Sequence, residues 1–329
     1  MQAIVLRHVF AFVFSCLLSL YLIPLIIRAT RRMGLLDVPD GNLKQHKEPI
    51  PHFGGIAVFL GFISTLALVY PFENKVLWLL LGTTLLLLVG LIDDLKVLRP
   101  GQKFFGQILA VLCFLKGGFS LKTNFFSSPL NLGFSAFWML SVINAFNLVD
   151  VMDGLSSIIA IVATTSLLVI SLIFQQYTVS LLLVCFLGPL LAFFWYNKPP
   201  ARIYLGDTGS MFVGGFLSAV PMLFAWSSQS FDAYYAPVVI LGIPLLEVFF
   251  LIIIRSYLRI PFYRGSPHHF SIYLQKKNWN KSKVLIFTGI MGIILSTLAF
   301  MFLFNVMSLW LLILSLLLFL TGWCIIIFR

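Results

Sequence analysis

The residues whose types could support chemistry form a short polar stretch between two long apolar segments. Asn144, Asn147, Asp150 and Asp153 follow one another at intervals of three residues, and Gly154 comes next. On a helix, this spacing places the polar side chains along one face. Ionisable groups are costly within a membrane, so their presence there indicates a functional site. Hydrogen bonding between packed helices would explain one asparagine, but it explains four polar groups poorly.

A second candidate site is the adjacent pair Asp93 and Asp94, which directly follows an apolar run. Two neighbouring carboxylates resist joint ionisation unless a cation compensates for their charge. Hard oxygen ligands suit Mg²⁺, so the pair predicts a magnesium site, while a solvated helix terminus is the simpler alternative. Further along, Lys103 and Gln107 are spaced i, i+4 and share a helix face.

A third candidate site follows Asn197, in a loop that ends with Gly206-Asp207-Thr208-Gly209-Ser210. A turn of this kind at the start of a helix suits an anion or a metal–phosphate complex at the helix N-terminus. The simpler alternative is an N-cap by Asp207 or Thr208. A cap does not need the flanking glycines, so the sequence favours a binding turn.

Two basic loops add further candidates. Lys47 precedes a stiff turn rich in proline and glycine, and it is a candidate for ligand binding. The alternative is that this loop contacts anionic lipid headgroups. Arg264 lies near His268 and His269 in another basic loop. No further ligand with zinc spacing is near this histidine pair, so contact with phosphate is favoured over metal binding.

The composition shows which elements must position these residues. The chain has 329 residues, of which 60% are hydrophobic and only 10% charged, far from the balance of a soluble domain. The first apolar run lacks a small-residue cleavage site and predicts a retained helix. The sequence therefore predicts an all-α polytopic membrane protein that forms a single domain over residues 1–329. About eleven apolar spans are expected, at residues 8–28, 53–71, 75–92, 104–119, 130–148, 155–174, 178–196, 211–227, 235–257, 284–304 and 307–328.

The loops between these spans differ in charge. The loops after odd-numbered spans, together with the C-terminus, contain 18 of the 22 lysines and arginines. The positive-inside rule therefore predicts that these loops are cytoplasmic and that the N-terminus is outside. Eight of the 11 acidic residues lie on the same side, which that rule does not explain. We interpret this as one composite active site built from cytoplasmic loops.

With these motifs in order, the chain resembles the polyprenyl-phosphate N-acetylhexosamine-1-phosphate transferase family along essentially its whole length. The matching residues are Lys47 before Pro49-Ile50-Pro51, the pair Asp93-Asp94, Lys103 with Gln107, the run Asn144, Asn147, Asp150 and Asp153-Gly154, Asn197 with Asp207, and His268-His269. Three positions depart from the family pattern. Val151 replaces a usual glycine, only two histidines stand where three are common, and Glu247 stands where relatives usually carry aspartate.

The resemblance implies transfer of a sugar 1-phosphate from a UDP-N-acetylhexosamine to undecaprenyl phosphate, with Mg²⁺ as cofactor and UMP as product. Such an enzyme starts the synthesis of a cell-envelope glycan and lies in the bacterial cytoplasmic membrane. N-acetylglucosamine 1-phosphate is the favoured group, because the basic loop lacks the three-histidine run ending in Phe-Glu of the phospho-N-acetylmuramoyl-pentapeptide branch. That branch is the alternative. The resemblance implies no nucleic acid partner, and a homodimer is possible.

The resemblance also suggests roles for individual residues. Asp207 with Asp93 or Asp94 would hold Mg²⁺, and the other member of the pair would position or deprotonate the acceptor phosphate. Asp150 and Asp153 would face the uridine and the sugar. A one-step attack and a covalent aspartyl intermediate both remain open. The remaining polar residues would bind substrate or its phosphates, namely Lys47, Lys103, Asn144, Asn147, Asn197, Arg264, His268 and His269.

A different class, a membrane transporter or lipid flippase, would also contain intramembrane polar residues. Transport sites lie near the middle of the membrane, whereas the acids of this chain gather on one face. A non-catalytic scaffold would give no reason for acids on that face. Both classes are therefore less favoured than the transferase.

Overall fold

The computed structural model describes residues 2–37, 49–70, 73–123, 126–224, 234–261 and 266–328. Within these ranges, seven helices have the length and composition needed to cross a membrane. An all-α polytopic membrane protein is thus confirmed, while the number of spans stays a prediction. The helices are α1 Gln2–Arg32, α2 Gly54–Val69, α3 Asn74–Leu95, α4 Pro100–Lys116, α5 Ser128–Val149, α6 Leu155–Ile173, α7 Tyr177–Asn197, α8 Gly206–Ala219, α9 Tyr235–Ile240, α10 Gly242–Tyr257, α11 Phe270–Lys276, α12 Lys281–Leu303 and α13 Leu309–Phe328.

Every predicted apolar span coincides with a helix, but two segments differ from a single continuous span. The eighth helix, α8, already begins at Gly206 and continues after Ala219 as a 3₁₀ turn, η1 Val220–Leu223. The ninth segment is divided at Leu241 into α9 and α10. Pro244 has no backbone N–H for the carbonyl of Ile240, so the helical hydrogen bonding cannot continue through this point.

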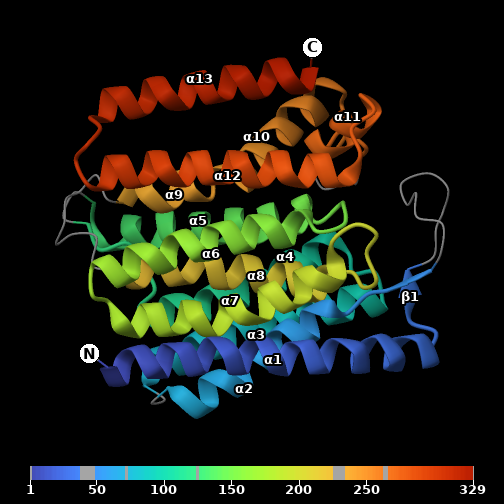
Figure 1. The fold of residues 1–329 in the computed structure, drawn as a ribbon. Helices are drawn as coiled ribbons and strands as arrows, with labels where there is room; N and C mark the ends of the chain where they lie inside the picture. Colours follow the sequence, from blue (N-terminus) through green and yellow to red (C-terminus); the bar gives the residue numbers. More distant parts are fainter. Residues whose placement is uncertain are drawn as a thin grey trace.

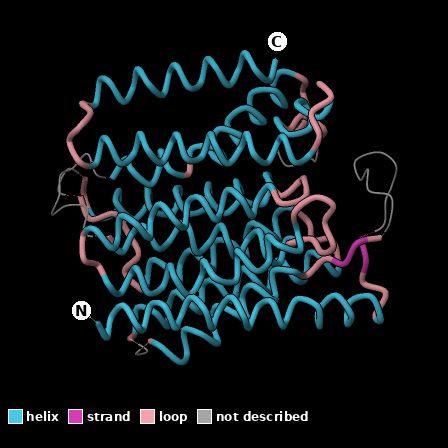
Figure 2. Tube along the Cα trace, viewed as in Figure 1, coloured by secondary structure: helices cyan, strands magenta, loops and turns pink. Residues whose placement is uncertain are grey.

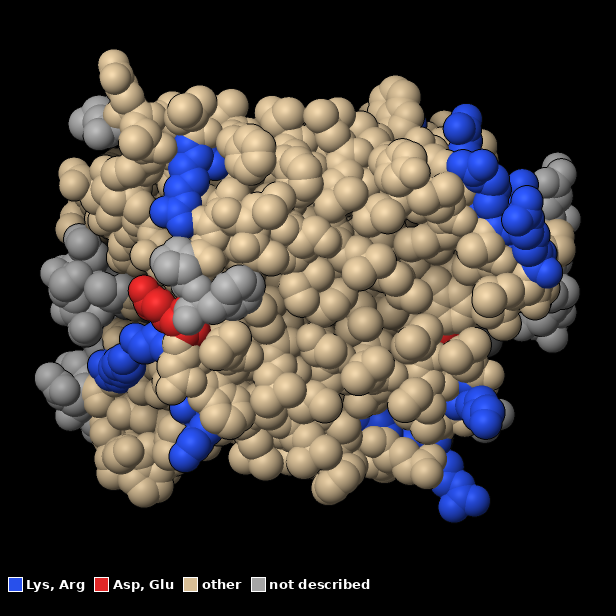
Figure 3. Space-filling model, turned by 90° about the horizontal axis from the view of Figure 1, so that it is seen from below, with Lys and Arg blue, Asp and Glu red and all other residues tan. Residues whose placement is uncertain are grey.

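The helices form a bundle with two distinct ends (Figure 1). One end carries β1 Leu36–Asp37 and α11, and the N-terminus lies at the opposite end. Most loops after the odd-numbered spans lie at the first end, which we call the β1 end (Figure 2). Lysines and arginines gather toward both ends of the face drawn in Figure 3, with a broad band free of Lys, Arg, Asp and Glu between them. Such a band suits the hydrocarbon core of a bilayer.

Helix α8 lies inside the bundle and packs against α2, α3 and α5. All of its residues from Thr208 to Ala219 are buried. Close contact with α3 depends on Gly90, because a Cβ there would lie 2.3 Å from the carbonyl oxygen of Asp207. The polar N-terminus of α8 is thereby held beside the end of α3 that carries Asp93 and Asp94.

A two-stranded hairpin closes the β1 end. β1 pairs antiparallel with β2 Ile50–Pro51, so that Leu36 faces Pro51 and Asp37 faces Ile50. The chain then attaches to the segment before α8. The backbone N–H of Tyr204 donates to Pro51 O at 2.8 Å, and the N–H of Gly54 donates to Tyr204 O at 2.9 Å. These bonds join the first loop to the start of α8.

Candidate active site

Asp93 and Asp94 are adjacent in sequence, yet they contact different partners. Asp94 accepts hydrogen bonds from the backbone N–H groups of Asp207 and Thr208, both at 3.0 Å, and from Thr208 Oγ1 at 2.6 Å. Its carboxylate therefore satisfies the free N–H groups at the start of α8. Asp93 accepts from Leu98 N at 2.7 Å and pairs with Lys103 at 2.8 Å. Separate partners thus compensate the two charges that repel each other.

The ammonium group of Lys103 is the centre of the site. It contacts Asp93 from α3, Asn147 from α5 at 3.0 Å, and Asp207 from α8. Its side chain is 19% exposed. Asn147 in turn donates through Nδ2 to Asp207 Oδ1 at 2.7 Å and to Ser210 Oγ at 3.1 Å. We call Asp93, Lys103, Asn147 and Asp207 the Lys103 cluster.

A second polar contact lies one helical turn from the cluster. Gln107 Nε2 donates to Asn144 Oδ1 at 3.2 Å, and Asn144 Nδ2 donates back to Gln107 Oε1 at 2.9 Å. The predicted shared face of Lys103 with Gln107 is therefore confirmed, as is the part of the polar stripe that holds Asn144 and Asn147. The prediction that this stripe continues along the helix to Asp150 and Asp153 is wrong, because α5 ends at Val149. The contacts of Lys103 with Asn147 and of Gln107 with Asn144 fix α4 against α5 at the site.

Asp150 ends α5 next to this cluster. Among the described residues, none donates a hydrogen bond to its carboxylate or pairs with it. Burial, together with the negative charges of Asp207 and Asp94, holds the pKa of Asp150 well above its usual value. Within the described part of the chain, Asp150 is thus an acid without a partner beside other acids, an arrangement that a bound cation would relieve.

Asp153 and Asn197 lie on another wall of the site, and their polar atoms are used within the protein. Asp153 pairs with Lys281 at 2.9 Å and accepts from Ala201 N at 3.2 Å. Asn197 accepts from Gly154 N and Ser157 Oγ, and it donates to Ile203 O at 2.9 Å. These contacts hold the segment 198–205 against the turn after α5. They favour a positioning role over the substrate contacts predicted from the resemblance.

Tyr204 lies in that same segment and is a site residue that none of the sequence motifs predicts. Its pKa is raised, first by burial and then by the negative charges of Asp153, Asp37 and Asp150. The hydroxyl group therefore stays protonated among several carboxylates. Tyr204 stands between Ile203 and Leu205, so the local sequence contains no signal that distinguishes it from its apolar neighbours.

Glu247, which stands where relatives usually carry aspartate, positions the histidine pair. His269 Nδ1 and Glu247 Oε1, from α10, lie 2.8 Å apart, and both side chains are buried. The N–H of Phe270 also points to this carboxylate, 3.3 Å from Oε1. Burial, aided by the nearby positive charge of Lys276, lowers the pKa of His268, which therefore stays neutral at neutral pH.

Among the described residues, no hydrogen bond or ion pair links either histidine to the Lys103 cluster. Helix α11 is nevertheless adjacent to the turn after α5, because Gln275 Nε2 lies 3.4 Å from Met152 Sδ. Two predicted residues, Lys47 and Arg264, fall in the segments 38–48 and 262–265 and lie outside the described residues. The structure therefore brings together Asp93, Asp94, Lys103, Asn144, Asn147, Asp150 and Asp207, with Asp153, Asn197, His268 and His269 around them.

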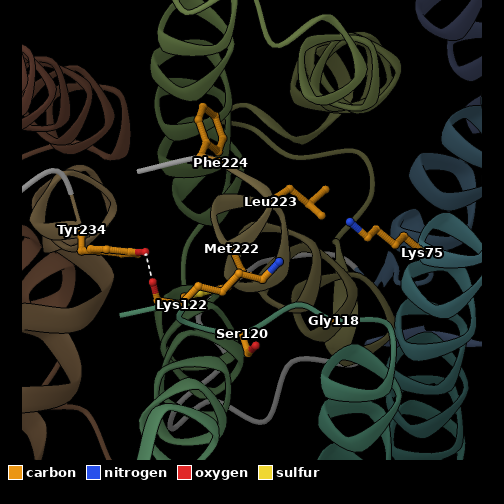
Figure 4. Close-up of a pocket in the computed structure, with 8 residues that line it drawn as sticks. All are labelled: Lys75, Gly118, Ser120, Lys122, Met222, Leu223, Phe224 and Tyr234. Atoms are coloured by element: carbon orange, nitrogen blue, oxygen red, sulfur yellow. Dashed lines mark hydrogen bonds between the residues drawn. The ribbon is translucent and has the colours of Figure 1, made fainter. Parts of the chain in front are cut away.

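A cavity of about 180 Å³ lies at the opposite end of the bundle (Figure 4). Lys75, Ser120 and Lys122 line it, and Tyr234 Oη donates to the Lys122 carbonyl oxygen at 3.0 Å. None of the predicted site residues lines this cavity. We therefore place the candidate active site at the Lys103 cluster, where the charged groups meet.

The fold and the site together define an integral membrane protein with an acid–amide–lysine cluster at one end of its helical bundle. A family model described as "Glycosyl transferase family 4" matches residues 76–225, which include the whole Lys103 cluster. The chain belongs to this family. Its relatives within the family are sugar-phosphate transferases.

Two relatives have informative names. A Bacillus subtilis (strain 168) protein named "Probable undecaprenyl-phosphate N-acetylglucosaminyl 1-phosphate transferase" is 31% identical over 261 residues, which cover 76% of this chain and 72% of the relative. A Streptococcus pneumoniae (strain 70585) "Phospho-N-acetylmuramoyl-pentapeptide-transferase" is 34% identical over 231 residues, which cover 63% of this chain and 70% of the relative.

Proposed function

We propose that this protein transfers N-acetylglucosamine 1-phosphate from its UDP-sugar to undecaprenyl phosphate and releases UMP. The observation that carries the proposal is the convergence of carboxylates, amides and a lysine from α3, α4, α5 and α8 at one end of a membrane-spanning bundle. A reaction between a polyanionic nucleotide and a lipid phosphate needs its charged groups at the membrane edge. The names of both relatives support transfer of a sugar phosphate, and the name of the Bacillus subtilis relative supports undecaprenyl phosphate as the acceptor.

In the proposed reaction, an oxygen of the acceptor phosphate attacks the β-phosphorus of the UDP-sugar. A new P–O bond forms, the bond to the bridging oxygen breaks, and UMP leaves with the electron pair of that bond. The second pKa of a phosphate monoester is about 6, so the acceptor is largely ionised at neutral pH. The protein then contributes mainly positioning and electrostatic stabilisation. Asp150, which has no partner among the described residues, is the carboxylate best able to take up a remaining proton.

Mg²⁺ is part of the proposal, and the donor set fits it. Oxygens of Asp93, Asp207 and Asn147 already surround a positive charge, and all are hard ligands. No group of three His, Cys, Asp or Glu within the described ranges could hold a metal ion alone. Mg²⁺ is commonly held by one or two carboxylates plus substrate phosphates. When bound, it would neutralise charge on the diphosphate. Because the carboxylate of Asp94 already accepts hydrogen bonds from the N-terminus of α8, we assign Asp93 to bind Mg²⁺ together with Asp207.

The proposed substrate is tested with purified protein in detergent, undecaprenyl phosphate and Mg²⁺, using two labelled donors in parallel. UDP-N-acetylglucosamine should yield labelled lipid and UMP. Turnover of only the UDP-N-acetylmuramoyl-pentapeptide would overturn the choice of sugar in favour of the second branch. Asp207→Asn should abolish Mg²⁺-dependent UMP release, and full activity of that variant would remove Asp207 from the metal site.

A further inference from the structure

Lys103 uses all of its hydrogen-bonding capacity inside the protein. Its ammonium group has three protons, and it faces three oxygens from three different helices, on Asp93, Asn147 and Asp207. No proton remains for a substrate phosphate. The phosphate-binding role that the resemblance gives to Lys103 therefore requires the side chain to leave this position.

The oxygens around the ammonium are also the oxygens assigned above to Mg²⁺. The ammonium alone leaves one negative charge on the two carboxylates of Asp93 and Asp207, whereas a divalent cation in its place would neutralise both. Two cations cannot occupy this set of oxygens together, because like charges a few Å apart repel strongly in a half-buried site. The lysine and a divalent cation must therefore compete for these oxygens.

We propose that the ammonium group of Lys103 occupies the position of the divalent cation when no cation is bound. The ammonium and the cation then exchange places during the reaction cycle. In the cation-free protein, the ammonium keeps Asp93, Asn147 and Asp207 together. When the cation binds, the flexible lysine stem turns the ammonium away toward the diphosphate. This second half rests on the proposed function, whereas the competition with the cation does not.

The other members of the cluster have partners that do not depend on Lys103. Asp207 is held by the helix start that Asp94 caps, and Asn147 is fixed by Ser210. One turn along α4, Gln107 remains bonded to Asn144. The lysine has a four-carbon stem with free rotation, so it is the most adaptable member of the cluster.

The proposal predicts effects of opposite sign on two ligands. Replacing Lys103 with methionine keeps most of the stem but removes the competing charge. Lys103→Met should therefore bind a divalent cation about tenfold tighter or more, since a unit charge at this distance is worth at least that factor. The same variant should bind UDP more weakly at saturating cation, because the phosphates lose a positive partner.

The test uses Mn²⁺ as the probe and the full-length protein in detergent without nucleotide, with free Mn²⁺ measured by electron paramagnetic resonance. Lys103→Gln serves as a second uncharged variant in case the methionine variant folds poorly. Lys96→Met removes an exposed positive charge at the same end and should leave Mn²⁺ affinity nearly unchanged. Asp207→Asn, alone and combined with Lys103→Met, should weaken binding in both backgrounds.

Tighter Mn²⁺ binding by both Lys103 variants, with weaker UDP binding, supports the exchange. Equal or weaker Mn²⁺ binding than in the wild-type protein would overturn it, as would an equal gain in Lys96→Met. The Mn²⁺ titration contains no donor or acceptor substrate. Failure of both UDP-sugars in the turnover assay would therefore reject the proposed function while leaving the cation competition standing.

Discussion

Residues with the same chemistry have different surroundings in this protein. Asp93 faces the lysine of the cluster, Asp94 caps α8, and Asp150 has no partner among the described residues. Adjacent carboxylates repel each other, so the fold stabilises the pair by giving each its own source of positive charge. The roles of these acids can therefore be separated by substitution.

Asp94→Asn should lower stability more than Asp93→Asn. An asparagine cannot accept all three hydrogen bonds from Asp207 and Thr208, and it removes the negative charge from the α8 N-terminus. We expect a loss of about 1–3 kcal/mol for Asp94→Asn. In Asp93→Asn, Lys103 keeps Asp207 and Asn147 as partners. Apparent melting temperatures in detergent measure the difference, and equal losses would contradict this division of roles.

Asp150 makes stability depend on pH in the cation-free protein. Its pKa is higher in the folded than in the unfolded state, so the folded state binds more protons and stability falls as pH rises through this window. Asp150→Asn should therefore raise the melting temperature in EDTA at neutral pH, and the gain should vanish toward about pH 4.

The matched control for this prediction is Asp153→Asn, which breaks a pair with Lys281 and should lower the melting temperature instead. A gain from Asp150→Asn that is the same at every pH would show that its carboxylate is not strained by its neighbours.

At the scale of elements, two short segments position the site. The start of α8 is held by α3 and by the loop before α2. The start of α11 is held by Glu247 from α10, which contacts both His269 and the N–H of Phe270. A carboxylate on one ring nitrogen fixes the tautomer and orientation of a histidine, leaving the other nitrogen for contacts elsewhere.

Glu247→Gln should lower turnover of the proposed reaction about 10–100-fold, the usual effect of removing a partner that orients a functional side chain. Glu73→Gln, at the opposite end, is the control and should behave as wild type. An unchanged rate for Glu247→Gln would show that this pair has only a structural role.

At the scale of the whole molecule, the charge of the loops predicts which end faces the cytoplasm. In a variant whose four cysteines are replaced by alanine, Lys122→Cys should react with a membrane-impermeant maleimide added to intact cells. Arg202→Cys, exposed at the β1 end, should react only after the membrane is permeabilised. The reverse labelling pattern would invert the predicted orientation and place the site outside.

Much of the site could be predicted because spacing along a helix decides which side chains share a face. Lys103 with Gln107, and Asn144 with Asn147, are examples that the structure confirms. Hydropathy did not predict that α8 begins as early as Gly206, nor that the chain breaks between α9 and α10. The first depends on Asp94, which is far away in sequence, and the second is a local effect of Pro244 within an apolar run.

The sequence by itself determined the membrane class, the helical segments and the set of polar residues that a bilayer would not tolerate without function. Only the tertiary structure decided that Asp93 and Asp94 contact different partners, that Glu247 orients His269, and that Lys103 lies among the oxygens suited to a cation. The physical reason is that periodicity acts along one helix. Which helices become neighbours depends on how their apolar faces and small residues pack against one another.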